Sequence, residues 1–299
     1  MRYRGRAGSD SHTELFGGYS GYTLIEVMIF IAATSFLLVI ALTNIGGRQA
    51  QVQFSQGVRD LESKLNDIIN DVSTGYFPTN TTLTCDATAP GRPIIGGSGA
   101  GNDGLGTDED CLYAGKALQF SPGGDDNKVL VYSLAGRRNV SGSPVVNLDD
   151  AAPVAIYLPG TSSTDSVEEI LVQNGVKIYR MFSTDAVPPL PPSSASETGI
   201  IGVLTNFEGA NPANSVSEGQ SVLVGGINGG KLGMSRTQAV AIIDSLESVP
   251  TNSGGLVLPN EGIVVCLNDG SSRKASITIG GGLGSRVVLD LDTYHEGCN

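Results

Sequence analysis

Residues 21–45 read GYTLIEVMIFIAATSFLLVIALTNI, and this stretch decides what kind of protein the chain can be. The 24 residues after Gly21 are apolar almost throughout. As a helix they would extend about 36 Å, which is enough to cross the hydrocarbon core of a bilayer. Three arginines precede the stretch. The positive-inside rule therefore predicts that residues 1–21 are cytoplasmic and that the chain after the helix lies outside.

Glu26 is the one charged residue inside this apolar stretch. A carboxylate in a membrane helix is costly, so its presence points to a function. Two simpler explanations stay open: Glu26 could reach the membrane interface from its place near the start of the segment, or the segment could be an ordinary secretory signal. The secretory signal is disfavoured because no good A-x-A cleavage site follows the apolar residues.

The sequence Gly21-Tyr22-Thr23-Leu24-Ile25-Glu26 resembles the processing motif of type IV prepilins and type II secretion pseudopilins. In that family a prepilin peptidase cuts after the Gly, the new amino terminus is usually methylated, and the Glu is the fifth mature residue. The resemblance implies that Gly21 and Tyr22 flank the cleaved bond and that Glu26 serves assembly. The chain departs from the commoner pattern in having Tyr at the first mature position and a leader of 21 residues.

This resemblance also implies the partners of the chain, namely a prepilin peptidase, other pilin subunits and an inner-membrane assembly platform. The apolar helix would remain as the membrane anchor and then form the filament core. A free amino terminus in that core is a buried positive charge, which is tolerable when a neighbouring carboxylate pairs with it. We expect Glu26 to be that partner and to set the register between subunits.

A second helical pattern follows the apolar one. Six apolar residues recur at spacings of three and four, which places them on one face of a helix: Phe54, Val58, Leu61, Leu65, Ile68 and Val72. Gly46-Gly47 is a weak point in this helix, and Gly75 followed by Pro78 predicts its end. We expect three parts: a leader over 1–21, a helix over 22–75 with its apolar part at 22–45, and an extracytoplasmic β-rich domain over 76–299.

The fold class predicted is α+β and pilin-like, with the apolar face of the helix packed on an antiparallel sheet. Residues 79–127 are expected to be mostly loop. Strands are expected over 117–120, 128–133, 154–158, 200–205 and 221–224, and as a hairpin over 168–172 and 176–181 around Asn174-Gly175. Ser235 is expected to cap a helix that runs to about residue 247.

The chain should end in three antiparallel strands, over 262–266, 274–279 and 286–291. Residues 256–290 resemble, more weakly, the closing strands of H-type pseudopilins and FimT-like minor pilins. Some of those relatives bind DNA through basic residues near the carboxyl end, and here only Arg273, Lys274 and Arg286 could correspond. The net charge of −12 disfavours a nucleic-acid partner, because phosphate contacts need Lys and Arg.

The four cysteines, Cys85, Cys111, Cys266 and Cys298, all lie after the apolar segment. Dispersed cysteines in an exported domain predict two disulfides, and sequence alone leaves three pairings open. The pairing of 85 with 111 and of 266 with 298 is favoured because short loops close at lower entropic cost. Four reduced thiols are the alternative if the domain stays in the cytosol.

An acidic, glycine-rich loop over 96–110 contains Asp103, Asp108 and Asp110. Their oxygens suit Ca²⁺, although the spacing does not fit an EF-hand. A solvated loop without a cofactor is the favoured interpretation.

No enzyme is predicted, since the sequence contains no GxSxG, HExxH or P-loop motif. We expect instead a structural subunit of a type IV pilus or a type II secretion pseudopilus. It would be membrane-anchored before assembly and would lie in an extracellular or cell-surface filament afterwards. The alternatives are a minor or tip pilin with an adhesin or DNA-uptake role, and a membrane-anchored surface enzyme or binding protein.

Overall fold

The computed structural model describes residues 21–75, 83–87, 91–97, 111–140, 142–145, 147–157, 167–183, 197–205, 222–246, 255–259, 261–281, 286–291 and 296–298. Residues 1–20 of the predicted leader, and Asp103, Asp108 and Asp110 of the predicted acidic loop, lie outside these ranges. The chain divides into two compact units, Met1–Ala50 and Gln51–Asn299, which are described separately.

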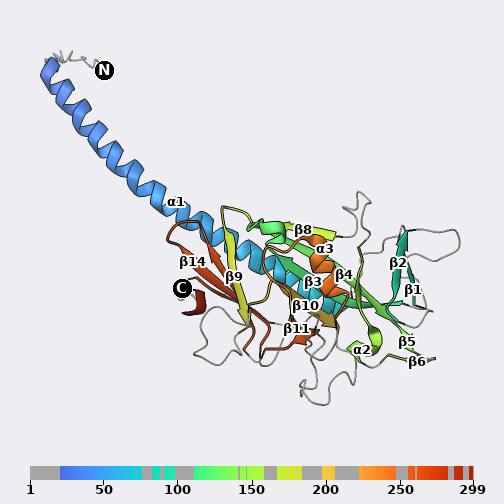
Figure 1. Ribbon diagram of the computed structural model, residues 1–299. Helices are drawn as coiled ribbons and strands as arrows, with labels where there is room; N and C mark the ends of the chain where they lie inside the picture. Colours follow the sequence, from blue (N-terminus) through green and yellow to red (C-terminus); the bar gives the residue numbers. More distant parts are fainter. Residues whose placement is uncertain are drawn as a thin grey trace, which may run out of the picture. The chain divides into compact units, whose positions relative to one another are not determined.

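The first helix, α1 (Leu24–Thr74), is the helix predicted over 22–75 (Figure 1). Its backbone stays helical through Gly46-Gly47, and Gly75 ends it with a left-handed φ of 67°. The amide of Gly75 donates to the carbonyl of Val72 at 3.1 Å. A glycine adopts this conformation without the steric cost of a Cβ, which explains why the helix ends there.

In the unit Gln51–Asn299, the predicted apolar face of α1 is buried. All six of its residues, from Phe54 to Val72, belong to one core cluster with side chains from two sheets. Leu61 and Leu65 are each 1% exposed. Burial of a Leu side chain contributes about 1.5–3 kcal/mol, so this face supplies a large part of the stability of the unit. The predicted packing of the helix on antiparallel strands is confirmed.

The larger sheet has the strand order β12-β11-β10-β3-β4-β7, and β8 also pairs with β4. Every pairing is antiparallel. Its strands are β3 (Cys111–Phe120), β4 (Lys128–Arg137), β7 (Val154–Ala155), β8 (Val167–Leu171), β10 (Ile200–Thr205), β11 (Val222–Ile227) and β12 (Leu256–Val257).

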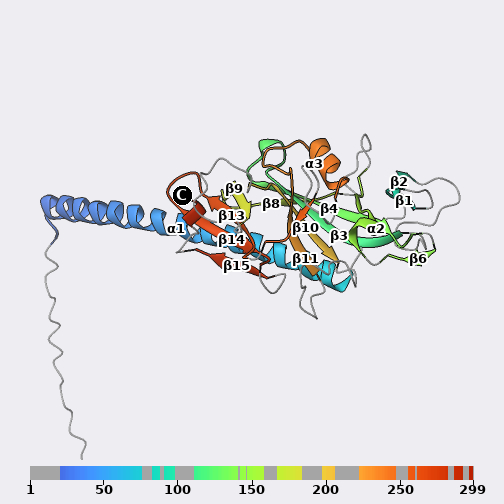
Figure 2. The same cartoon turned by 60° about the horizontal axis from the view of Figure 1, so that its bottom comes forward.

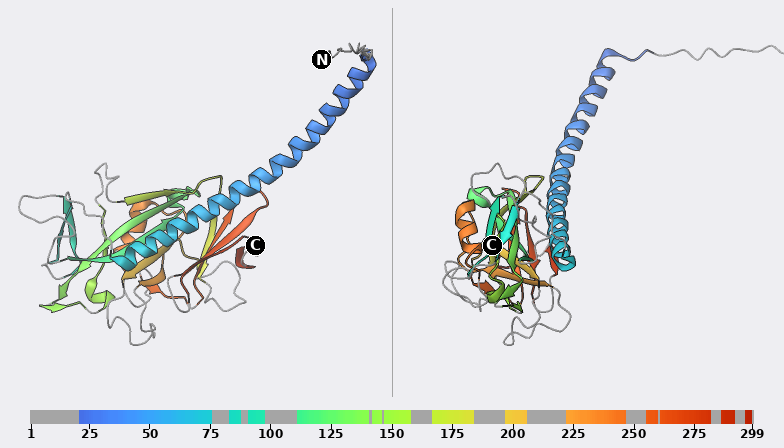
Figure 3. Two further views of the ribbon diagram at one scale, coloured as in Figure 1. Left: turned by 180° about the vertical axis from the view of Figure 1, so that it is seen from behind. Right: turned by 90° about the vertical axis from the view of Figure 1, so that its right-hand side faces the viewer.

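Different helices pack on the two faces of this sheet (Figure 3). Leu118 and Phe120 of β3 belong to the core cluster beneath α1. Ala117 belongs to the opposite cluster, which includes Ala239 and Ile243 of α3 (Arg236–Ile243). The unit is therefore layered, with α1 on one face of the sheet and α3 on the other.

The smaller sheet has the order β15-β14-β13-β9. Its strands are β9 (Lys177–Ser183), β13 (Ile263–Asn268), β14 (Lys274–Ile279) and β15 (Val287–Asp290). The last three form the antiparallel meander that the sequence predicts. They lie beside the second half of α1 (Figure 2), and Val265 and Ile277 join its core cluster.

The remaining elements are short. They comprise β1 (Leu83–Asp86) paired with β2 (Ile94–Gly97), β5 (Asn139–Val140) paired with β6 (Ser143–Pro144), the helix α2 (Leu148–Ala151), and the 3₁₀ turns η1 (Pro122–Gly124) and η2 (Glu296–Cys298). The expectation that residues 79–127 are mostly loop is wrong for the part of this range that the structure describes, which is mostly strand. Both β1 and β2 fall in this range, and β3 begins at Cys111 rather than at residue 117.

The predicted hairpin around Asn174-Gly175 is also wrong, although its turn is present. Asn174 and Gly175 have left-handed φ angles of 60° and 72°, and the amide of Val176 donates to Gln173. The flanking strands nevertheless diverge, because β8 pairs with β4 and β9 pairs with β13. The backbone of residues 126–127 contacts the chain on both sides of the turn. The carbonyl of Asn127 accepts from the amide of Val172, and the carbonyl of Asp126 accepts from the amide of Ile178.

The α3 helix begins where the sequence predicts. Ser235 is its N-cap, and Gln238 completes a capping box with it. The helix ends at Ile243, four residues before the predicted end, and Leu246 in the following turn is fully buried.

Candidate functional site at the start of helix α1

Gly21, Tyr22 and Thr23 precede α1 in a non-helical conformation, and the helix begins at Leu24. The hydroxyl oxygen of Thr23 accepts a hydrogen bond from the amide of Glu26 at 3.3 Å. The carbonyl of Thr23 accepts from the same amide at 3.0 Å and from the amide of Val27 at 3.2 Å. Thr23 is therefore the N-cap of α1, and it satisfies backbone donors that a helix start otherwise leaves unpaired.

Thr23 has no predicted role, although the sequence contains a signal for its capping. Thr23-x-x-Glu26 followed by an apolar run is the pattern of a capping box.

Glu26 lies in the first turn of α1 and is exposed. A negative charge at this place is favoured by the partial positive charge at the helix N-terminus. The exposed carboxylate is therefore placed at the helix start where it can pair with a cation from outside the chain.

Within the unit Met1–Ala50, the helix around Glu26 has an apolar surface that is exposed over the residues that the structure describes. The span Leu24–Ala41 has a mean hydropathy of 2.5, and none of it is buried. Tyr22 and Leu24 are 81% and 79% exposed. Thr34 satisfies its hydroxyl internally, because it donates to the carbonyls of Phe30 and Ile31 at 2.9 and 3.0 Å. This surface suits a bilayer or a bundle of apolar helices, in which free backbone and hydroxyl groups are costly.

The structure brings Gly21, Tyr22 and Glu26 together at one helix start, within the unit Met1–Ala50. The predicted cysteines lie in the other unit and form two disulfides, Cys85–Cys111 and Cys266–Cys298. This is the pairing favoured by loop entropy. Among the residues that the structure describes, no group of three or more His, Cys, Asp or Glu could hold a metal ion.

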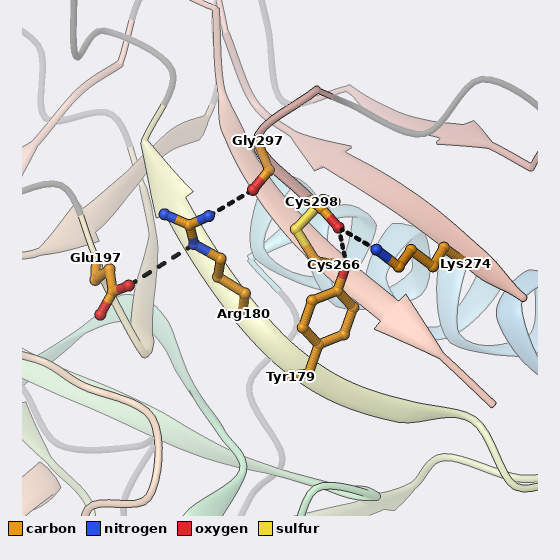
Figure 4. Close-up of a disulfide and its surroundings, with 7 residues drawn as sticks. All are labelled: Tyr179, Arg180, Glu197, Cys266, Lys274, Gly297 and Cys298. Carbon is orange, nitrogen blue, oxygen red and sulfur yellow. Dashed lines mark hydrogen bonds and ion pairs between the residues drawn. A yellow bond between two sulfur atoms is a disulfide. The ribbon is translucent and has the colours of Figure 1, made fainter. Parts of the chain in front are cut away.

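The second disulfide lies within a set of contacts that fix η2 to the smaller sheet (Figure 4). The hydroxyl of Tyr179 and the ammonium of Lys274 both donate to the carbonyl of Cys298, the latter at 3.2 Å. Arg180 donates to the carbonyl of Gly297 at 2.7 Å and forms an ion pair with Glu197 at 3.7 Å. Cys266 and Cys298 are both fully buried.

Two of the basic residues near the carboxyl end, Arg273 and Lys274, have partners within the domain. Lys274 donates to Cys298, and Arg273 contacts the carboxylate of Asp269 at 2.7 Å. Both side chains are therefore held within the domain.

The chain matches no family model, and searches of curated proteins and of solved structures found no significant match.

Proposed function

We propose that this chain is the precursor of a filament subunit of the type IV pilin class, cut between Gly21 and Tyr22 and assembled through α1. The filament is a type IV pilus or a type II secretion pseudopilus. Before assembly, the leader faces the cytoplasm and the β-rich unit lies outside. The proposed partners are a prepilin peptidase, an inner-membrane assembly platform and other pilin subunits.

The observation that carries this proposal is the isolated charge of Glu26 in the otherwise apolar, exposed segment Leu24–Ala41 of α1. A carboxylate in an apolar environment needs a cation, and residues 22–45 contain none. Cleavage after Gly21 creates a cation, the amino group of Tyr22, at the start of each helix. Glu26 of one subunit can pair with that amino group of a neighbour, so processing supplies the missing charge.

The continuity of α1 supports the same proposal. One helix carries both the apolar segment over 24–41 and the face over 54–72 that is buried beneath two sheets. A secretory signal is removed together with its apolar segment, whereas here the segment continues into a helix on which the domain core depends.

Mass spectrometry of the amino terminus tests this function. Surface filaments are sheared from cells that express the chain, and the subunit is digested and its first peptide sequenced. We expect a chain that begins at Tyr22, with a methylated amino group. Uncut precursor in the filaments, or a chain cut after the apolar segment, would refute the proposal.

A further inference from the structure

We propose that Thr23 is a positioning residue for processing, because its cap keeps the carbonyl of Gly21 out of helix α1. This inference rests on the proposed function, since it concerns the bond between Gly21 and Tyr22. It adds a role for a residue that lies next to that bond without being part of it.

The hydrogen bonds at the helix start carry the argument. The first regular helical bond of α1 runs from the amide of Val27 to the carbonyl of Thr23, at 3.2 Å. The preceding amide, that of Glu26, is already bonded to the hydroxyl and the carbonyl of Thr23. Thr23 thus takes up the donor that the next helical bond would need.

The same geometry shows what happens when the cap is absent. Helical bonds join the amide of residue i to the carbonyl of residue i−4. Extending α1 by one bond would pair Glu26 with the carbonyl of Tyr22. Extending it by two would pair Ile25 with the carbonyl of Gly21, which belongs to the bond that is cut.

A carbonyl bonded within a helix is a poor substrate for a peptidase. The nucleophile must reach the carbonyl carbon, and the carbonyl oxygen must be free to accept hydrogen bonds that stabilise the transition state. The apolar surroundings favour extension of the helix, because an unpaired amide is costly there. Thr23 opposes that extension by providing the amide of Glu26 with an acceptor inside the helix start.

The test compares the full-length precursor with three variants. Thr23→Val keeps the shape of the side chain and removes the hydroxyl, whereas Thr23→Ser keeps the hydroxyl and removes the methyl. Thr34→Val is the matched control, because it makes the same substitution in the same apolar helix, away from the cut. Each precursor is incubated in detergent with purified prepilin peptidase, and the initial rate is measured below KM. The carbonyl of Gly21 is labelled with ¹³C, and its chemical shift is measured without peptidase.

We expect Thr23→Val to be cut about fivefold more slowly, which corresponds to about 1 kcal/mol for a lost N-cap. Its Gly21 carbonyl should shift toward the value of a helical glycine. Thr23→Ser should be cut within about twofold of the wild-type rate, since Ser is at least as good an N-cap as Thr. Thr34→Val should match the wild type in both measurements.

Two results would overturn the inference while leaving the proposed function intact. The first is wild-type cleavage of Thr23→Val. The second is slow cleavage of Thr23→Val with an unchanged carbonyl shift, which would mean that the hydroxyl contacts the peptidase directly. If the wild-type precursor itself is not cut after Gly21, the proposed function is refuted and this inference with it.

Discussion

The ammonium of Lys116 lies 2.8 Å from a carboxylate oxygen of Asp71, and this ion pair joins β3 to the last turn of α1. The side chain of Lys116 is 5% exposed, whereas that of Asp71 is 40% exposed. The last turn of α1 contains no basic residue of its own, so Lys116 supplies the cation that favours a helix C-terminus. Burial raises the pKa of nearby Tyr113, and the charge of Asp71 raises it further.

Asp71→Asn should lower the free energy of unfolding by about 2–4 kcal/mol, because it leaves the buried ammonium of Lys116 without its counter-ion. Urea denaturation of the unit Gln51–Asn299 measures this loss. Asp67→Asn is the control, since Asp67 is an exposed acid one turn earlier on the same helix. The double variant Asp71→Asn/Lys116→Met should regain most of the loss. Equal effects at positions 67 and 71 would contradict the prediction.

Gly57→Ala should destabilise the unit, although Ala is the better helix former by about 1 kcal/mol. A Cβ at this position would lie 2.7 Å from the carbonyl oxygen of Gln173 and 2.8 Å from Cγ2 of Val176. Relieving such contacts costs about 1–3 kcal/mol in a packed core, so we expect a net loss of stability. Thermal unfolding measures it, with the exposed neighbour Gln56→Ala as the control. A higher melting temperature for Gly57→Ala would show that the helix and the turn over 173–176 are less closely packed.

The turn between β13 and β14 should be sensitive to acid because of Asp269. Its carboxylate accepts from the amide and hydroxyl of Ser271 at 2.9 and 2.7 Å, and from the amide and guanidinium of Arg273 at 3.2 and 2.7 Å. Partial burial acts to raise the pKa of Asp269, but these hydrogen bonds outweigh it and hold the pKa below its ordinary value.

The lowered pKa of Asp269 determines how its contribution to stability changes with pH. The folded pKa of Asp269 lies below that of the unfolded chain, about 3.9, so its stabilisation is present above that pH and is lost as pH falls through the folded pKa. Asp269→Asn should therefore cost about 1 kcal/mol at pH 7, with a smaller cost below pH 4. Urea denaturation across this range tests it, with exposed Glu261→Gln as the control. A cost independent of pH would mean that the charge of Asp269 is not what stabilises the turn.

Glu26→Ala should still be cut to a chain that begins at Tyr22, but we expect it to enter filaments at least tenfold less often, because an amino group would stay unpaired in the apolar core. Glu26→Gln is the matched variant of the same size, and it should also enter filaments poorly because it lacks the charge. Glu26→Asp should enter filaments more often than Glu26→Ala and less often than the wild type, since it keeps the charge but shortens the reach of the side chain by about 1.5 Å. Immunoblots of precursor and mature chain, with counts of the subunit in sheared filaments, measure both steps. Normal incorporation of Glu26→Gln would defeat the charge-pair mechanism.

The elements that were predicted correctly are those whose contacts follow from local sequence patterns. The spacing from Phe54 to Val72 fixes one face of a helix, and that face is buried. The closing strands β13, β14 and β15 follow one another through short connections, so their pairing could be expected from their order. Each disulfide likewise joins two consecutive cysteines of the chain, at sequence separations of 26 and 32.

The misjudged elements depend on contacts between distant residues. The left-handed turn at Asn174-Gly175 is set by local chemistry, yet the partners of β8 and β9 are chosen elsewhere in the chain. In β3, residues 114–120 are all buried because both faces of the sheet are covered, so the sequence shows no regular alternation. The burial of Lys116 could not be foreseen either, because its counter-ion lies on a different element.

The candidate site was predictable in part. The resemblance to the prepilin motif predicts roles for Gly21, Tyr22 and Glu26, and the structure places all three at the start of α1. The role of Thr23 as N-cap was overlooked although its pattern was present, and the contacts of Tyr179 and Arg180 with η2 have no sequence pattern, because they join residues more than 100 positions apart.

The order of strands in the smaller sheet has a consequence for biosynthesis. β9 pairs with β13, which lies about 80 residues further along the chain. At 5–20 residues per second, the ribosome reaches β13 roughly 4–16 s after it completes β9. During that interval the edge of β9 is open to pairing with other chains. We therefore expect chains that end before β13 to aggregate more readily than the complete chain.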